Sequence, residues 1–294
     1  MLTTPVIFER YQQIRSRTPR ASTAVAIQDI ESLLDIADQV DAFVFDAFGV
    51  LNVGNTLIAG ADRRLLGLRE RGCQIRILTN AASYDHAGAV EKFRRLGLSV
   101  EGTEIVTSRQ AALAALSSIN WGVIAAPEDA LGDVTVPWTR LGDQPDQFDA
   151  VEGFLFLSST GWTEERQRQL VESLVASPRP VVIANPDLVA PRDDGFSLEP
   201  GHYGHLLVDQ GIESVQFFGK PFPDVYDIVE ASLPGTAPEK IVMCGDTLHT
   251  DIVGAAARDW RTVLVTQDGL FAGHETRFFC EESGLYPDWR LARI

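Results

Sequence analysis

The sequence predicts an α/β protein with parallel β-sheet, and two observations support this fold class. Short apolar runs rich in β-branched residues alternate with helical stretches along most of the 294 residues. These runs are apolar almost throughout rather than at every second position. This pattern is typical of parallel strands that are covered by helices on both faces.

The expected elements follow each other regularly along the chain. Expected strands, each a short apolar run, lie at 42–46, 74–80, 103–108, 122–126, 154–158, 181–185, 215–219, 240–246 and 262–266. Expected helices between them include 60–72, 85–97 and 163–176.

Shifts in composition divide the chain into four segments. Residues 1–38 are expected to form a helical extension. The loop-rich stretches 127–149 and 186–204 carry Pro, Gly and Asp. They indicate a second α/β unit at 110–210, inserted between two core segments, an N-terminal one at 39–109 and a C-terminal one at 211–294.

Net charge and cysteine content indicate which binding partners and which cellular environment to expect. A net charge of −16 repels nucleic acid and anionic lipid, so neither is expected as a partner. No run reaches the roughly 18 apolar residues of a membrane span, and no secretory signal pattern is present at the N-terminus. Cys73, Cys244 and Cys280 are too few for a disulfide framework. We therefore expect a cytoplasmic protein.

Polar residues that suit phosphate chemistry follow two of the strands in the N-terminal half of the chain. Asp46 ends the strand at 42–46, and Thr79 and Asn80 end the next one. Ligands bind at the carboxyl ends of strands in an open parallel sheet. Read alone, Asp46 fits a strand end equally well, and Thr79 and Asn80 fit a helix cap better than an anion site.

Two further clusters follow strands near the C-terminus. Lys220 lies between Gly219 and Pro221, in a turn that restricts its backbone. Asp246 and Asp251 flank one strand-to-helix turn, and paired carboxylates suit a hard cation such as Mg²⁺. A solvated turn lysine and helix-capping aspartates are the structural alternatives.

Together, these clusters support a functional site more strongly than each does alone, because one parallel sheet would bring all of them to the same edge. Asp46, Thr79, Lys220 and Asp246 would then supply a nucleophile, an anion clamp, a cation and a metal ligand. Phosphoryl transfer depends mainly on positioning and charge stabilisation, which such a set provides.

In this order, the clusters resemble the haloacid dehalogenase (HAD) superfamily over residues 40–275, most closely its NagD-like, p-nitrophenyl-phosphatase-like subgroup. The matching segments are 46-DAFGVL, 78-LTNAAS, 184-ANPD, 219-GKP and 245-GDTLHTDI. The resemblance implies a Rossmann-like parallel-sheet core with an inserted α/β cap domain. It also implies an enzyme, a phosphatase that acts on a small phosphorylated molecule such as a sugar phosphate, a nucleotide or an aryl or acyl phosphate.

The resemblance also implies a role for each site residue. Asp46 would be the nucleophile that forms an aspartyl-phosphate. Thr79 and the backbone N–H of Asn80 would hold the phosphoryl oxygens. Lys220 would pair with both Asp46 and the phosphate.

The same resemblance implies a magnesium site. Asp246, Asp46 and the backbone carbonyl of Phe48 would bind Mg²⁺, with Asp251 supporting the ion from a second layer. Asn185 and Asp187 match the family's NPD segment without a defined role. Relatives often pair through the cap, so a homodimer is one possible assembly.

The chain departs from the family pattern at Phe48, where an acidic residue normally protonates the leaving oxygen. General acid–base help of this kind is typically worth about 10²–10⁴-fold in rate. We therefore expect a preference for good leaving groups such as aryl or acyl phosphates. His249 is a candidate replacement acid, although an exposed loop histidine is the simpler interpretation.

Other functions remain open beside the phosphatase. Phe48 fits a catalytically degenerate protein that only binds a phosphorylated metabolite. Dehalogenase chemistry needs no metal, which disfavours it because Asp246 and Asp251 are both present. Phosphonate hydrolysis needs a cap lysine, and 110–210 contains none.

The sequence leaves the substrate undetermined. The expected specificity loops are 127–148 and 192–205, the second of which includes His202, Tyr203 and His205. Ordinary loop packing nevertheless explains any one of these side chains better.

Overall fold

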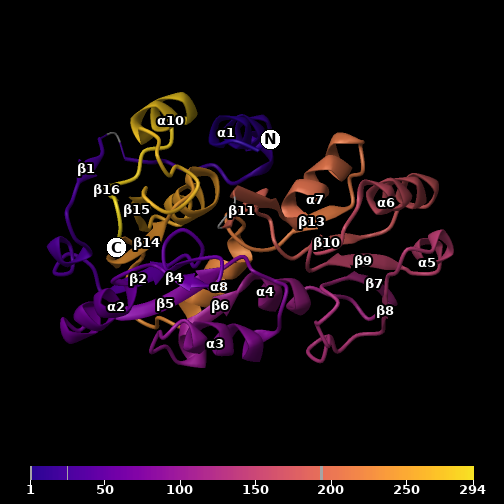
Figure 1. Ribbon diagram of the computed structural model, residues 1–294, viewed down its shortest axis with the longest axis horizontal. Helices are drawn as coiled ribbons and strands as arrows, with labels where there is room; N and C mark the ends of the chain where they lie inside the picture. Colours follow the sequence, from indigo (N-terminus) through magenta and orange to yellow (C-terminus); the bar gives the residue numbers. More distant parts are fainter. Residues whose placement is uncertain (1, 25, 193–194) are drawn as a thin grey trace.

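The computed structural model describes residues 2–24, 26–192 and 195–294, which form two lobes side by side (Figure 1). Each lobe is built on its own parallel sheet, with helices packed around it. The larger lobe holds both ends of the chain, and the smaller one is formed by the middle of the sequence (Figure 1).

The larger sheet has seven strands in the order β1-β16-β15-β14-β2-β5-β6, and the smaller has five in the order β13-β10-β9-β7-β8. The strands of the larger sheet are β1 Gln28–Asp29, β2 Ala42–Phe45, β5 Gln74–Thr79, β6 Ile105–Thr107, β14 Ile241–Gly245, β15 Arg261–Val265 and β16 Trp289–Leu291. Those of the smaller sheet are β7 Trp121–Ile124, β8 Trp138–Arg140, β9 Gly153–Phe156, β10 Val181–Ile183 and β13 Val215–Phe217. Two antiparallel hairpins stand apart from both sheets, β3 Asn52–Val53 with β4 Thr56–Leu57, and β11 Val189–Arg192 with β12 Gly195–Leu198.

Ten α-helices connect the strands of the described residues. They are α1 Thr4–Gln13, α2 Ala61–Glu70, α3 His86–Arg95, α4 Ser108–Ala114, α5 Pro145–Asp149, α6 Glu164–Ala176, α7 Pro200–Asp209, α8 Pro223–Ala231, α9 Val253–Ala256 and α10 Thr276–Ser283. None of them is long and apolar enough to cross a membrane.

The larger sheet is buried on both faces, as its apolar strands predict. Along β2, Phe43 and Phe45 belong to one apolar cluster, whereas Ala42 and Val44 belong to another. The first cluster includes side chains of α2 and α3, and the second includes side chains of α4 and α8. Alternate side chains of a strand point to opposite faces, so helices on both sides explain why β2 has no polar position.

The predicted fold class is confirmed, and each of the nine expected strands overlaps an observed strand. The three named helices correspond to α2, α3 and α6. The short strands β1, β3, β4, β8, β11, β12 and β16 were not predicted, because two to four residues give too little pattern to recognise.

The smaller sheet extends slightly further along the chain than the expected inserted unit. Its edge strand β13 lies at Val215–Phe217, beyond the boundary expected at residue 210. The chain returns to the larger lobe only at α8. The expected domain boundaries at residues 39, 110 and 211 therefore remain predictions.

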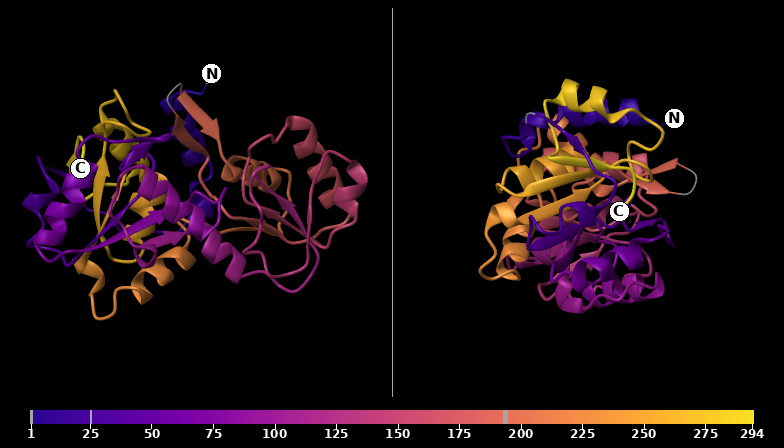
Figure 2. Two further views of the ribbon diagram at one scale, coloured as in Figure 1. Left: turned by 60° about the horizontal axis from the view of Figure 1, so that its bottom comes forward. Right: turned by 90° about the vertical axis from the view of Figure 1, so that its left-hand side faces the viewer.

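The N-terminal segment joins the two lobes. Phe8 of α1 packs against Phe279 of α10 in the larger lobe, with ring centroids 4.9 Å apart. The two helices lie side by side (Figure 2). Arg10 and Arg17 form ion pairs of 2.5 and 2.6 Å with Asp209, the last residue of α7 in the smaller lobe. The segment 1–38 is therefore more than a helical extension, and it also supplies β1, the edge strand beside β16.

His205 of α7 is a buried histidine at this junction. Its ring stacks on Phe217 with centroids 4.3 Å apart, and the side chain of Arg17 contacts it. The pKa of His205 is lowered from 6.5 to about 3, first because burial disfavours the imidazolium and then because Arg17 and Arg10 repel it. The native state therefore holds a neutral His205 over most of the acid range.

This predicts a loss of stability in acid. Below about pH 6.5 the unfolded chain binds a proton at His205 that the folded protein does not bind, so the free energy of unfolding falls as pH drops toward 3. The contribution of one such group is about 1.4 kcal/mol per pH unit. Urea denaturation at several pH values should show a shallower acid limb for His205→Gln. His274→Gln, at an exposed histidine, is the control that keeps the wild-type slope, and an equal slope in both variants would contradict the assignment.

Candidate active site

The site lies at the carboxyl ends of three adjacent strands of the larger sheet. Asp46 follows β2, Thr79 ends β5 on one side of it, and Asp246 follows β14 on the other. All three strands run parallel, so their carboxyl ends share one edge. The topology therefore brings together residues more than 160 positions apart in the sequence, as expected for ligand sites in open parallel sheets.

A buried lysine joins two of the acidic residues. The Nζ atom of Lys220 lies 2.5 Å from Oδ1 of Asp46 and 2.7 Å from Oδ1 of Asp251. Lys220 is only 1% exposed, so the charged contacts are shielded from water. It reaches the site from the segment between β13 and α8, which connects the two lobes. This contact between Lys220 and Asp46 is the one expected from the sequence.

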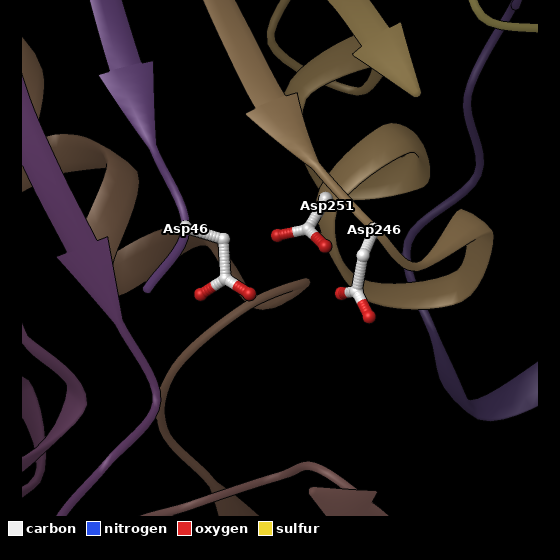
Figure 3. Close-up of side chains that lie close together, drawn as sticks. All are labelled: Asp46, Asp246 and Asp251. Carbon is white, nitrogen blue, oxygen red and sulfur yellow. The ribbon is translucent and has the colours of Figure 1, made fainter. Parts of the chain in front are cut away.

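Three carboxyl groups gather beside the lysine. One oxygen each of Asp46, Asp246 and Asp251 lies within 4.8 Å of the others. Figure 3 shows the three side chains close together, Asp46 at the end of one strand and Asp246 and Asp251 around the end of its neighbour. Asp251 belongs to a π-helical turn, Leu248–Ile252, of the kind often found at functional sites.

The hydrogen bonds distinguish the three carboxylates. Asp251 uses Oδ1 for Lys220 and accepts the backbone N–H of Thr247 with Oδ2 at 3.1 Å. Asp246 accepts the Thr247 hydroxyl at 3.0 Å and the backbone N–H of Leu270 at 2.7 Å. Oδ2 of Asp46 has no side-chain hydrogen-bond partner among the described residues, and Asp46 lines the cavity. This oxygen therefore stays accessible to a ligand.

The electrostatics of the cluster favour the binding of a cation. Burial, and after it the neighbouring Asp46 and Asp251 carboxylates, together raise the pKa of Asp246 to about 8. The pKa of Asp46 is raised to about 6, again mainly by burial, although Lys220 opposes the shift. Three carboxyl groups against one lysine leave an excess of negative charge in a buried space. An oxygen-seeking divalent cation fits such a donor set.

Glycines allow the carboxylates to approach the backbone this closely. Gly49 has a φ of +80°, and a Cβ there would lie 2.7 Å from an oxygen of Asp246. A Cβ at Gly245 would overlap the carboxyl group of Asp251. Any larger residue at either position would push the acidic side chains apart.

Thr79 and Asn80 have different environments. Thr79 lines the cavity beside Asp46, and its hydroxyl accepts the backbone N–H of Ala81 at 3.1 Å. The side chain of Asn80 accepts the backbone N–H of Lys220 at 2.7 Å and donates to the Lys220 carbonyl at 2.9 Å. Asn80 therefore fixes the backbone from which Lys220 extends, a role that the sequence did not reveal.

The NPD segment lies in the same cavity. Asp187 accepts a hydrogen bond of 2.8 Å from the amide of Asn80, and Asn185 accepts the backbone N–H of Asp187 at 3.0 Å. Burial raises the pKa of Asp187 well above its usual range, which favours its neutral form. This segment of the smaller lobe therefore contacts the larger lobe directly at the site.

A cavity of about 680 Å³ opens from Asp46 toward the smaller lobe. Phe48 forms part of its wall. Lys92 of α3 places Nζ 3.9 Å from the centroid of the Phe48 ring, and the guanidinium carbon of Arg192 lies 5.3 Å from it. Neither cation was identified from the sequence, because a helix lysine and a loop arginine carry no distinguishing pattern.

One sequence expectation is wrong, and another is met only in part. His249 is buried rather than exposed, stacks on Tyr11 of α1 and contacts Gln12, and it does not line the cavity. It therefore cannot replace the acid that Phe48 lacks. None of the described cavity-lining residues comes from 127–148. The stretch 192–205 contributes Arg192 and Glu199 instead of its two histidines and Tyr203, while residues 193 and 194 lie outside the described residues.

Two segments of the chain match known protein families. Residues 43–126 match the family described as haloacid dehalogenase-like hydrolase, and residues 217–278 match one described as HAD-hydrolase-like. The first segment contains Asp46 and Thr79, and the second contains Lys220, Asp246 and Asp251. Both halves of the site thus lie within matched segments.

Similar proteins include phosphatases. Human glycerol-3-phosphate phosphatase is 29% identical over 258 residues, which are 76% of this chain and 78% of the relative. Phosphoglycolate phosphatase 1A of Arabidopsis thaliana is 38% identical over 104 residues, 35% of this chain and 28% of its own.

Solved structures share the fold at lower identity. A possible sugar phosphatase of the HAD superfamily from Cytophaga hutchinsonii has a TM-score of 0.79 at 21% identity, covering 90% of this chain and 98% of its own. NagD from Escherichia coli has a TM-score of 0.64 at 19% identity, covering 86% and 96%.

The close packing at Gly245 gives a test of the site's geometry. Gly245→Ala should destabilise the protein by about 1–3 kcal/mol, the usual cost of overpacking, because the new methyl group displaces Asp251. Gly132→Ala is the matched control, since a Cβ there meets nothing within 4 Å. Urea denaturation should leave Gly132→Ala within about 0.5 kcal/mol of wild type. Equal stability of the two variants would show that the cluster is looser than the structure indicates.

Proposed function

We propose that this chain, which belongs to the haloacid dehalogenase superfamily, is a magnesium-dependent phosphatase that hydrolyses a small phosphomonoester through Asp46. The observation that carries the proposal is the pairing of Asp46 with the buried Lys220 at the edge of the sheet, beside two further carboxylates. A nucleophile, a fixed cation and a cation-binding cluster are the components that phosphoryl transfer requires.

The residues define the two steps of the reaction. Oδ2 of Asp46 attacks phosphorus and a bond forms between them; the ester P–O bond breaks, and its oxygen leaves with the bonding electrons and takes a proton from water. Water then hydrolyses the aspartyl-phosphate and restores Asp46. A pKa of about 6 leaves Asp46 largely ionised near neutral pH. Lys220 stays charged because the carboxylates of Asp251, Asp46 and Asp187 raise its pKa, outweighing the opposite effect of burial.

The phosphoryl oxygens need donors at the same edge of the sheet. In the proposed complex, the Thr79 hydroxyl and the backbone N–H of Asn80 hold these oxygens, while Lys220 offsets their charge. Lys220 and Asn80 are already held rigidly by two mutual hydrogen bonds. Such preorganised donors stabilise developing charge without reorganisation during the reaction.

The proposed metal site consists of Asp46, Asp246 and the backbone carbonyl of Phe48. Asp251, whose two oxygens already contact Lys220 and Thr247, supports the site from behind. When bound, Mg²⁺ supplies positive charge that offsets the negative charge of the phosphoryl group.

Phe48 limits the chemistry at the leaving group. The ring offers no proton to the departing oxygen, and His249 is buried against α1. The proposed enzyme therefore depends on the acidity of the leaving alcohol, and aryl or acyl phosphates are favoured over alkyl phosphates. The relatives named as glycerol-3-phosphate and phosphoglycolate phosphatases support a small phosphomonoester as the substrate class.

A second candidate is a protein that binds such an ester without turnover. The absence of an acid at Phe48 favours it, while the paired Asp46 and Lys220 favour catalysis. Trapping distinguishes the two, because a binder forms no phosphorylated Asp46.

The proposal predicts phosphate release that depends on both Asp46 and Mg²⁺. Wild-type protein should release phosphate from 4-nitrophenyl phosphate with MgCl₂ present, and chelation should abolish the activity. Asp46→Asn should lower the rate at least about 10³-fold, because the covalent step is lost. Mass spectrometry of rapidly quenched enzyme should find the phosphoryl group on Asp46. Binding without turnover in wild type would favour the second candidate.

A second prediction concerns the leaving group. Phe48→Asp should raise kcat/KM for glycerol 3-phosphate by about 10²-fold or more, because general acid help is worth about 10²–10⁴-fold. The gain should be much smaller for 4-nitrophenyl phosphate, whose alcohol needs no proton to leave. Phe48→Asn, which gives a side chain of the same shape as Asp without the acid, is the control. A wild-type enzyme that already hydrolyses both esters equally well would refute the role given to Phe48.

A further inference from the structure

Two cations that the proposed reaction does not use lie against Phe48 in the cavity next to Asp46. Lys220 contacts Asp46 and Asp251, whereas Lys92 and Arg192 contact neither of them. Both instead lie against the ring of Phe48, and they come from different elements of the two lobes, α3 and the end of β11. The cations near Asp46 therefore lie at two separate positions, Lys220 beside the carboxylates, and Lys92 with Arg192 beside Phe48.

The two cations lie near each other. Their distances from the Phe48 centroid are 3.9 Å for Nζ of Lys92 and 5.3 Å for the guanidinium carbon of Arg192. They are thus no further apart than the sum of these two distances, and they repel each other. An anion placed between them would remove this repulsion and gain charge-assisted hydrogen bonds.

Both cations keep hydrogen-bond donors that existing contacts do not use. Arg192 donates Nε to Ser197 at 2.8 Å and Nη2 to Glu199 at 3.1 Å, while Nη1 has no partner among the described residues. Lys92 forms no ion pair and no hydrogen bond with any residue that the structure describes. Glu199 forms an ion pair with Arg192, whereas no carboxylate of the described residues lies in ion-pair contact with Lys92.

Composition makes the position of Lys92 unusual. The lysines of this chain are Lys92, Lys220 and Lys240; Lys92 lines the cavity, whereas Lys220 is buried beside Asp46. The chain as a whole has a net charge of −16. Two neighbouring positive charges beside Phe48 attract an anionic group locally, although carboxylates line other parts of the cavity.

We propose that Lys92 and Arg192, arranged around Phe48, form a second anion site that selects a phosphomonoester bearing another acidic group, either a carboxylate or a second phosphate. The inference rests on the proposed function, because the first phosphate is assigned to the position beside Asp46. Phe48 provides the apolar wall along which the linker between the two anionic groups lies.

The test compares ligands that differ only in this second charge. The pair is 4-carboxyphenyl phosphate and 4-carbamoylphenyl phosphate, which have the same shape and similar leaving groups. Affinities are measured by calorimetry with MgCl₂ on the Asp46→Asn protein, which cannot turn them over. The carboxylate ligand should bind roughly ten- to hundredfold more tightly, as expected for a charge-assisted contact.

Substitutions of Lys92 and Arg192 then test whether these side chains cause the difference in affinity between the two ligands. Adding Lys92→Met should reduce the affinity ratio of the two ligands toward one, and Arg192→Gln should reduce it partly. Lys92→Arg should retain the ratio because it keeps the charge, and Lys240→Met, at the remaining lysine, should leave it unchanged. Thermal denaturation checks that each variant is folded.

The outcomes separate this inference from the proposed function. An affinity ratio near one in the Asp46→Asn protein overturns the second anion site, as does equal weakening of both ligands by Lys92→Met. Absence of phosphate release by the wild-type enzyme overturns the phosphatase instead, and the affinity ratio still decides the anion site. A second pair, propane-1,3-diol bisphosphate and 3-hydroxypropyl phosphate, shows whether a phosphate replaces the carboxylate.

Discussion

The buried cation of Lys220 is the interaction on which the arrangement of the site depends. It neutralises Asp46 and Asp251 together in a space from which water is largely excluded. Without it, these carboxylates and Asp246 would repel each other across less than 5 Å. Removing one partner from a buried ion pair costs far more than the pair contributes, because an uncompensated charge remains. The position of Lys220 is therefore as constrained as that of Asp46.

The location of Lys220 also connects the two lobes. It follows β13, the last strand of the smaller sheet, and precedes α8 of the larger lobe. Asn80 fixes its backbone through two hydrogen bonds and also contacts Asp187 of the smaller lobe. The same few hydrogen bonds thus position Lys220 and connect the two lobes. Local disturbance of this junction would affect chemistry and domain placement together.

Phe48 changes the electrostatics of the cavity next to Asp46 and Lys220. An acidic side chain there would add a further negative charge beside Asp46, whereas an aromatic ring adds none. The ring face attracts cations, and Lys92 and Arg192 lie against it. The aromatic ring at this position is therefore linked physically to the two cations that pack on it.

The sequence by itself determined the fold class, the longer strands and the residues at the strand ends. Buried parallel strands must be apolar throughout, and the polar residues that end them share one edge, so Asp46, Thr79 and Asp246 could be placed together before the structure was known. Only the tertiary structure decided which other side chains reach that edge. Lys92 on a helix and Arg192 in a hairpin lack any local pattern, and His249 was misjudged because its burial depends on α1, more than 230 residues away. Periodicity and strand ends are local properties, whereas contacts between distant elements are set by how the lobes pack.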